Sequence, residues 1–160
     1  MGDITTIRCK DVIKQKEIIR TLADNLRAVD EYECIAMGAL DGYHGLLLSL
    51  NEADSLSYIG LCDNKPVWAY GINTKPLDGL GYCIWFLGTD AVSEHRKYFV
   101  IKSMETVRQW QKQYGQLWNA VHKNNKKAIR WLKWLGATFT PLEEIDGFFL
   151  FTLPSLKERT

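Results

Sequence analysis

The sequence predicts an α/β (α+β) fold in which about four to five helices flank a mixed central sheet of about six to seven strands. Three consecutive β-prone runs between Ser57 and Leu87 predict an antiparallel meander. A buried strand, a helix and another strand between Leu117 and Thr140 predict an α/β layer. A length of 160 residues fits one domain on the usual scale of roughly 100 to 200 residues. We therefore expect a single domain over residues 1–156 and a loose tail over 157–160.

The N-terminal third is predicted to hold one strand and several helices. Ile4–Cys9 combines apolar and β-branched residues, as short strands do. Asp11 is the expected cap of a helix whose apolar positions recur at helical spacing as far as Val29. Further helices are expected over Asp30–Met37 and from about Tyr43 to Leu50. The glycines between them interrupt the pattern, so these segments do not form one rod.

The middle of the chain is predicted to be a three-stranded meander. Two β-prone runs, Ser57–Cys62 and Val67–Asn73, flank the turn residues Asp63–Pro66, which is a hairpin signal. A third run, Tyr82–Leu87, follows the turn Gly79–Gly81. These three strands are expected to pair antiparallel in succession.

A crossover is predicted after the meander. A loop over Gly88–Ser93 precedes a long helix from about Glu94 to Tyr114, and Leu117–Val121 is an apolar strand. A strand, helix and strand in this order form a right-handed β-α-β unit, so the strands that begin at Tyr82 and Leu117 are expected to be neighbours.

The last quarter is predicted to hold a capped helix and two strands. Asn124 or Asn125 is the expected N-cap, and Gly136 ends the helix. Strands are expected over Ala137–Thr140 and Phe148–Leu153. The helix carries an apolar stripe at i, i+3, i+4 and i+7, made of Ala128, Trp131, Leu132 and Leu135.

Composition excludes several classes of protein. The formal net charge of +1 gives no overall reason to expect nucleic acid or an anionic membrane as a partner. No apolar run reaches the roughly 18 to 20 residues of a membrane span, and the N-terminus lacks a signal-peptide pattern. We expect a soluble protein that remains in the cytosol. The cysteines form no C-x-x-C pair and are expected to be reduced; they are Cys9, Cys34, Cys62 and Cys83.

The C-terminal helix carries a family resemblance. Asn125, then Ala128-Ile129-Arg130, then Gly136 before an aromatic strand resembles the last conserved motif of the GNAT N-acetyltransferase superfamily. The resemblance implies a GNAT-like acyl-CoA N-acyltransferase fold, with two central strands splayed to admit coenzyme A. In that superfamily a tyrosine seven residues after the asparagine often serves as general acid. Leu132 stands at that place in this sequence.

The segment before the long helix departs from the superfamily pattern. The resemblance implies a loop of the type Gly-x-Gly or Gly-x-Ala there, whose backbone N–H groups close on the cofactor's pyrophosphate. This sequence has no glycine between Gly88 and Lys97, and it places Asp90 and Glu94 in the region. Those carboxylates suit the N-terminus of a helix as caps and repel a diphosphate, and we favour the capping interpretation.

A narrower resemblance extends over nearly the whole chain. The most specific motifs are Trp85–Asp90 and Arg130–Gly136, which are similar to those of the internal virion protein A family of short-tailed phages. The resemblance implies phage virion or host proteins as partners, in the host cytoplasm or the virion. Further matching positions are Arg27, Asp30, Glu33, Ser55 or Ser57, Pro66-Val67 and Leu117–Val121.

Two residues are candidates for catalysis. His122 closes a strand beside the expected cleft, where it is either a general base or a structural histidine. Glu33 lies in the helical region that borders the acceptor site in GNAT folds. Glu33 and Asp30 are otherwise solvated carboxylates or partners of Arg27. His44 and His95 lie in no metal-ligating constellation, and no metal is expected.

Cofactor residues follow from the resemblance. If the chain is an enzyme, it is expected to bind acetyl-CoA or coenzyme A. Asn119 lies within an apolar strand and needs a hydrogen bond, either to the neighbouring strand or to a pantetheine amide. The full set of candidates is Trp85, Phe86, Leu87, Ser93, Arg96, Asn119, Asn125 and Arg130.

A run of cations surrounds the start of the last helix. Its members are either a solvated face or a site for an anion, such as a coenzyme A phosphate, a nucleic-acid backbone or an acidic partner. Trp110 and Trp134 are candidates for an aromatic patch facing another subunit, which leaves a homo-oligomer open. The cations are Lys123, Lys126, Lys127, Arg130 and Lys133.

Two functions remain after the sequence is considered. One is a phage virion-associated or host-interaction protein, acting in assembly or genome delivery, that keeps an acetyltransferase scaffold with a degenerate cofactor loop. The alternative is an acetyl-CoA-dependent N-acetyltransferase that modifies an amine on a host or phage protein. A fold by itself does not separate them, because one scaffold hosts many roles.

Overall fold

The computed structural model describes residues 3–158, which cluster into two compact units. Unit 1 extends to Asn73 and includes Trp85–Arg96, whereas unit 2 comprises Thr74–Ile84 and everything from Lys97 onward. The single domain over residues 1–156 stays a prediction. Residues 157–158 of the predicted tail have no regular secondary structure, and residues 159–160, like residues 1–2, lie outside the described part.

Unit 1 contains an antiparallel sheet that begins at the N-terminal strand. β1 (Ile4–Arg8) pairs with β2 (Ser55–Cys62), which pairs with β3 (Lys65–Asn73). Asp63 and Asn64 have φ angles of 50° and 66°, as both central residues of a type I′ hairpin turn require. The turn is therefore two residues long, and the four-residue turn predicted over Asp63–Pro66 was too long because Lys65 and Pro66 already belong to β3.

The helices of unit 1 correct the predicted boundaries. The helix expected from Asp11 to Val29 is the shorter α1 (Lys16–Asp24). The separate helix expected over Asp30–Met37 is present as α2 (Ala28–Ala36), which begins two residues earlier. Asp11 does not cap α1, because its carboxylate accepts from the amides of Ile13 and Lys14 in a preceding turn. The helical pattern breaks before α2 because the Arg27 amide donates to the carbonyl of Gly88, a tertiary bond, at 2.9 Å.

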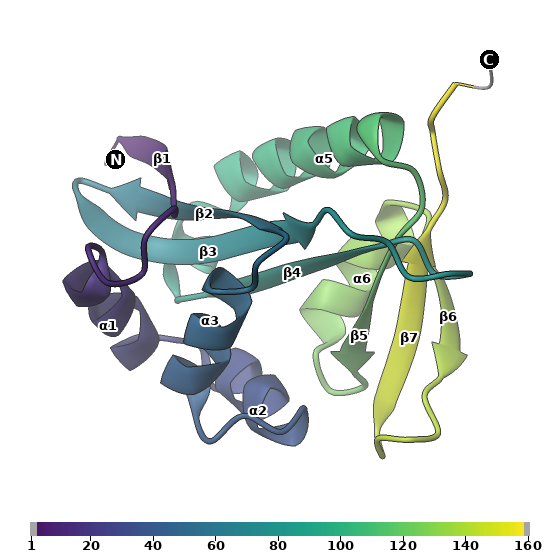
Figure 1. The fold of residues 1–160 in the computed structure, drawn as a ribbon, viewed down its shortest axis with the longest axis horizontal. Coiled ribbons are helices and arrows are strands. Elements are labelled where there is room, and N and C mark those ends of the chain that lie inside the picture. Colours follow the sequence, from purple (N-terminus) through teal and green to yellow (C-terminus); the bar gives the residue numbers. More distant parts are fainter. Residues whose placement is uncertain (1–2, 159–160) are drawn as a thin grey trace. The chain divides into compact units, whose positions relative to one another are not determined.

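The core of unit 1 lies between its helices and its sheet. α1 and α3 (Gly42–Leu50) lie on one side of β2 and β3 in Figure 1. The close approach of α2 to α3 depends on Gly45, since a Cβ there would lie 2.6 Å from the Cys34 sulfur. Fully buried side chains from both layers meet in this core, including Ile19, Leu22, Leu46 and Ile59.

Unit 2 contains the other edge of the strand order. The seven strands follow the order β1-β2-β3-β4-β5-β7-β6, and the residues of β4 (Tyr82–Gly88) are divided between the units. Within unit 2, β4 pairs parallel with β5 (Leu117–His122), and β7 (Phe148–Leu153) pairs antiparallel with both β5 and β6 (Thr138–Pro141). The predicted parallel neighbours and the predicted bounds of β7 are confirmed.

Two helices complete unit 2. α5 (Arg96–Gln113) and α6 (Lys126–Trp134) contact each other through the rings of Phe99 and Trp131, whose centroids are 6.4 Å apart. The long helix predicted from Glu94 starts later, because the backbone of His95 leaves helical geometry and separates α5 from the short α4 (Ala91–Glu94). None of the helices in residues 3–158 is both long and apolar enough to cross a membrane.

Candidate functional site

The predicted site residues fall into two groups, one in each unit. Unit 1 holds Glu33 on α2, Trp85–Leu87 on β4, Ser93 on α4, and Arg96 at the start of α5. Unit 2 holds Asn119 and His122 on β5, the N-cap residue Asn125, and Arg130 on α6. Each group has its own geometry, and each contains a strand that runs into a helix.

A buried ion pair holds the end of β4 in unit 1. The Asp30 carboxylate, 2% exposed, accepts from Nε and Nη2 of Arg27 at 2.8 and 3.1 Å. The same carboxylate accepts from the amide of Gly88 at 2.9 Å, while the Gly88 carbonyl accepts from the Arg27 amide. We call this set the Arg27–Asp30 clamp. It confirms the interpretation of Asp30 as an Arg27 partner and corrects the idea of a solvated carboxylate.

The clamp has a defined electrostatic balance. Burial raises the pKa of the Asp30 carboxyl group, and the Arg27 guanidinium and the Gly88 amide oppose that effect without cancelling it. The guanidinium carbon of Arg27 also lies 5.7 Å from the ring centroid of Phe86, within cation–π range. The pair is therefore structural, and its carboxylate already accepts three hydrogen bonds, two from Arg27 and one from Gly88.

Nearly all backbone N–H groups in the loop after β4 are already hydrogen-bonded. The Thr89 amide and hydroxyl both donate to the carbonyl of Val67, and the hydroxyl accepts from the Ala91 amide. Every backbone amide from Gly88 to His95, apart from that of Asp90, donates to an acceptor in unit 1. A pyrophosphate site needs several convergent, uncommitted N–H groups. This loop therefore does not fit the diphosphate of coenzyme A.

The predicted caps of this loop need a correction. Asp90 occupies the N-cap position of α4, yet its side chain makes no capping hydrogen bond. Thr89 supplies that bond because its buried hydroxyl lies 3.3 Å from the Ala91 amide. Glu94, Ser93 and Arg96 are exposed.

Gly88 is required by close packing. An added Cβ would lie 2.8 Å from Cε1 of Phe86 and 3.0 Å from Cγ2 of Val92. Leu87 is buried in the unit 1 core, and Trp85 lies against Gly71, where an added Cβ would come within 2.7 Å of the indole nitrogen. The three predicted strand residues Trp85–Leu87 thus all lie near packed groups of unit 1.

Asn119 joins two strands in unit 2. The parallel register of β4 and β5 pairs Tyr82 with Leu117 and Cys83 with Trp118. At the next position the Asn119 side-chain amide donates to the carbonyl of Ile84, and its Oδ1 accepts from the Ala120 amide at 2.7 Å. Of the two predicted partners for Asn119, the structure supplies the neighbouring strand.

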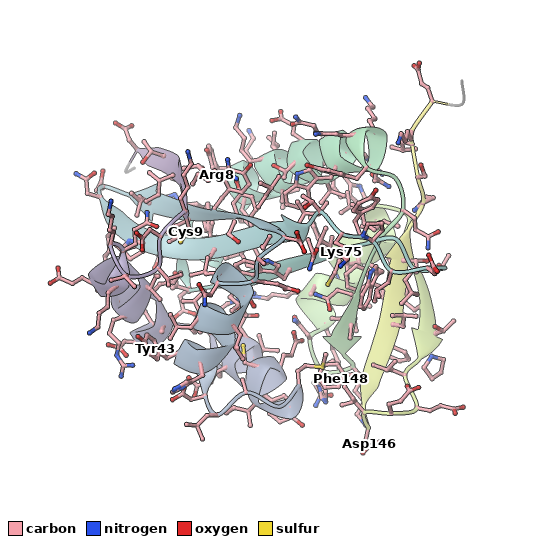
Figure 2. The ribbon with its side chains drawn as sticks, viewed as in Figure 1. Arg8, Cys9, Tyr43, Lys75, Asp146 and Phe148 are labelled. Atoms are coloured by element: carbon pink, nitrogen blue, oxygen red, sulfur yellow. The ribbon has the colours of Figure 1, made fainter. Side chains whose placement is uncertain are left out.

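His122 is enclosed by its surroundings at the end of β5. The side chain is 5% exposed, its Nδ1 accepts from the Asn124 amide at 3.2 Å, and its ring meets that of Phe148 edge-on at 5.1 Å. Phe148 lies at the start of β7, next to Asp146, as Figure 2 shows. A Cβ on Gly147 would come within 2.9 Å of Nε2. These contacts describe a packed structural histidine, and its role as a base stays a prediction.

The β5–α6 junction uses mostly local bonds, together with one from the Lys123 amide to the Gly147 carbonyl at 2.8 Å. The Asn125 side chain accepts from the Ala128 amide, which confirms one of the two predicted N-caps, and the Asn125 amide donates to the His122 carbonyl. Leu132, at the position of the superfamily's tyrosine, is 3% exposed and belongs to the apolar side of α6. The junction thus presents no hydroxyl at that position.

The opposite side of α6 is strongly basic. Lys126, Lys127, Arg130 and Lys133 are exposed, and Trp134 beside them is 58% exposed. We call these five residues the α6 basic face. The ion pairs found within residues 3–158 all lie outside the α6 basic face. Its four cations are therefore exposed to solvent. Arg130 therefore belongs to a surface and not to an enclosed pocket.

Two surface hollows lie elsewhere on the described residues. One, of about 310 Å³, is lined in unit 1 by residues that include Arg8 and Cys9, which are labelled in Figure 2. The other lies along α5 in unit 2. None of the predicted site residues lines either hollow. The described residues also hold no group of three side chains suited to a metal ion.

Thr89 is the residue that the sequence analysis missed. A threonine directly before a helix start is a capping signal, and the sequence showed it beside Asp90. The Gly88 contact of Asp30 had no such local signal, because 58 residues separate the two positions.

Solved structures share this fold. The ribosomal-protein-S18-alanine N-acetyltransferase from Escherichia coli matches with a TM-score of 0.62 and 10% identity, over 100% of this chain and 97% of that one. An acetyltransferase (GNAT family) from Bacillus anthracis matches with a TM-score of 0.64, 10% identity and 97% coverage of both chains. A spermidine N-acetyltransferase from Vibrio cholerae, in complex with CoA and spermine, gives 0.64, 9% and 96% of both.

The fold and the sequence together identify the structural class and the family of the protein. The strand order, the crossover and these neighbours define a GNAT acetyltransferase fold, as predicted. A family model described as "Bacteriophage T7, probable scaffold protein Gp13" matches residues 64–143, which is half of the chain. The chain belongs to this phage family. No curated protein matches it in sequence.

Proposed function

We propose that this protein is a phage assembly or virion-associated protein that uses a GNAT scaffold for packing and not for acyl transfer. The observation that carries the proposal is the closed loop after β4. Its amides from Gly88 to His95, Asp90 excepted, already have acceptors, and Asp30 holds Gly88 from outside the loop. The family's description as a probable scaffold protein supports the same conclusion.

The proposal implies partners and a location. Phage virion or host proteins are the partners, either during assembly or during genome delivery, and internal virion protein is the narrower identity that we propose. The protein acts in the host cytoplasm and, if it is retained, in the virion.

Cofactor binding provides the first test. Isothermal titration of the purified protein with acetyl-CoA and with coenzyme A should give no saturable heat. The spermidine N-acetyltransferase from Vibrio cholerae, whose structure contains CoA, serves as the positive control. Binding at micromolar or tighter affinity would overturn the proposal.

Particle composition provides the second test. Quantitative mass spectrometry of purified procapsids and mature particles from phage-infected cells should detect the protein in at least one of them. Presence in procapsids alone indicates assembly, and retention in mature particles indicates delivery. Absence from both, with no phage or host protein co-purifying, contradicts the proposed role.

An acetyl-CoA-dependent N-acetyltransferase, modifying an amine on a host or phage protein, is the second candidate. The observation that favours it is that β4 and β5 pair in parallel over only two residue pairs. Beyond them the Asn119 side chain, in place of a backbone amide, donates to the Ile84 carbonyl. His122 and Glu33 are its proposed catalytic residues, although His122 Nδ1 already accepts a bond. Incubation with labelled acetyl-CoA and host lysate tests it, and no transfer to any amine would end it.

A further inference from the structure

The two units carry opposite formal charges. Counted over the whole sequence, unit 2 has twelve lysines and arginines against six aspartates and glutamates, a net charge of +6. Unit 1 has eight against thirteen, a net charge of −5. The two values sum to the overall charge of +1. A chain with a net charge close to zero therefore divides into one positively and one negatively charged unit.

The α6 basic face is the most concentrated part of the positive unit. With about 3.6 residues per turn, its five residues fall on one side of the helix, opposite Leu132 and Leu135. Lys126 and Lys127 lie in the first turn, where the helix dipole disfavours cations. α6 contains no acidic residue that would compensate them. The face is thus unfavourable for the isolated helix and suited to an anionic partner.

Unit 1 presents a surface of complementary chemistry on α2. Tyr32 and Ile35, one helical turn apart, are 53% and 49% exposed, and Leu40 just beyond the helix is 78% exposed. Glu31 lies beside them and is exposed. We call these four residues the α2 ridge. Apolar side chains of this size, edged by a carboxylate, are typical of an interaction surface.

We propose that the α6 basic face docks on the α2 ridge of a second copy of the chain, head to tail. Trp134 would pack on Tyr32 and Ile35, while Arg130 and its neighbouring lysines would meet Glu31 and the negative unit around it. Tryptophan, tyrosine and arginine are the residue types that dominate interface energetics.

Symmetric alternatives are electrostatically unfavourable. Pairing α6 with α6 would oppose four cations with four cations, and pairing unit 1 with unit 1 would bring two net charges of −5 together. A head-to-tail contact joins unlike surfaces and repeats into rings or open chains. Nucleic acid would use the basic face but would leave the α2 ridge uncovered. A second copy accounts for both surfaces.

This inference rests on the proposed assembly role and specifies one partner of it. A single helix-on-helix contact is small, so the association should be weak and concentration-dependent. It should also strengthen at an ionic strength of about 0.01 M, where charges act over about 30 Å.

The test uses two variants that each remove one surface without adding charge. Arg130→Ser with Trp134→Ser truncates two central residues of the α6 basic face, and Tyr32→Ser with Ile35→Ser truncates the two helical apolar residues of the α2 ridge. Sedimentation velocity at rising concentration should show association of the wild-type protein and a dissociation constant raised by about tenfold or more in each variant. Circular dichroism checks that both variants are folded. Ile13→Ser and Lys112→Ser, at exposed positions on other surfaces, should associate like the wild type.

Mixing the two variants distinguishes the geometry. Each retains the surface that the other lacks, so an equimolar mixture should form dimers and nothing larger. A wild-type protein that stays monomeric, or a mixture that stays monomeric while the wild type associates, would overturn the inference. Binding of a labelled oligonucleotide that is lost in the α6 variant, by a monomeric wild type, would also overturn it. A monomer still found in phage particles would reject head-to-tail docking while the assembly role stands.

Discussion

The β4–α4 junction of unit 1 and the β5–α6 junction of unit 2 both lead a strand into a helix, yet they are held in different ways. The first is held by groups that are remote in sequence. The Asp30 carboxylate accepts from the Gly88 amide, and the Val67 carbonyl accepts from the Thr89 hydroxyl. The second is held mainly by bonds between residues that are at most three positions apart, centred on His122 and Asn125, with one longer-range bond from the Lys123 amide to the Gly147 carbonyl.

This difference has a chemical consequence. The remote bonds of unit 1 occupy the backbone donors that an anion would need, so the junction is closed even though it sits at a helix start. In unit 2 the local bonds leave the cations of α6 on the surface. The two junctions thus differ in whether their polar groups are already bonded within the unit or remain exposed to solvent.

The largest expected effect comes from breaking the remote junction. Asp30→Ala leaves the Arg27 guanidinium and the Gly88 amide without their acceptor, and should lower the free energy of unfolding by about 3 kcal/mol. Urea denaturation followed by circular dichroism measures it. Asp24→Ala, which removes an exposed ion pair with Arg20, is the matched control and should change stability by less than about 0.5 kcal/mol. A loss below about 1 kcal/mol for Asp30→Ala would contradict the clamp.

The packing at the same junction gives the next effect. Gly88→Ala should cost about 1–3 kcal/mol, because the new methyl group would lie 2.8 Å from the Phe86 ring. Phe86→Leu in the same chain removes that ring carbon and should recover part of the loss. A double-mutant cycle from denaturation midpoints measures the coupling. Strictly additive losses would show that the ring is not the obstacle.

The local junction should be less sensitive. Asn125→Ala removes the N-cap bond of α6 and should cost about 0.5–1 kcal/mol, at the low end because the bond to Ala128 is 3.4 Å long. Asn125→Asp keeps the acceptor and should keep most of the stability. Asn124→Ala is the matched control, since only its backbone amide is used, and thermal melts should place it with the wild type. Equal losses at both positions would show that the cap is not specific.

Most features of the β5–α6 junction were predictable from the sequence, because they depend on residues that are close together in the chain. The Asn125 cap, the Leu132 and Leu135 stripe and the strand Phe148–Leu153 each depend on residues within a few positions of one another. Turn residues at Asp63 and Asn64 likewise marked the hairpin. In each case the signal and the structure occupy the same short segment.

The remote features were not predictable in the same way. The helix expected from Asp11 to Val29 breaks because the Arg27 amide donates to Gly88, and no periodicity shows a partner so far along the chain. The break at His95 has no glycine or proline to mark it. For the candidate site, the Arg27 pairing of Asp30 followed from the i, i+3 spacing, but the closure of the loop by Thr89 and Asp30 required the fold.

The smallest effect separates the junctions by pH. Because burial raises the pKa of Asp30, the folded protein holds that proton more tightly than the unfolded chain does. This contribution to stability is full below the ordinary aspartate pKa, about 3.9, and is lost as the pH rises through the higher folded value. The stability of wild type minus that of Asp30→Asn should therefore fall as the pH rises above about 4 and then level off. Asn125→Ala removes no titratable group, so the stability difference between this variant and the wild type should not change with pH in the same urea titrations. A wild-type advantage over Asp30→Asn that grows with pH would mean that Arg27 and Gly88 outweigh burial and hold the carboxyl pKa low.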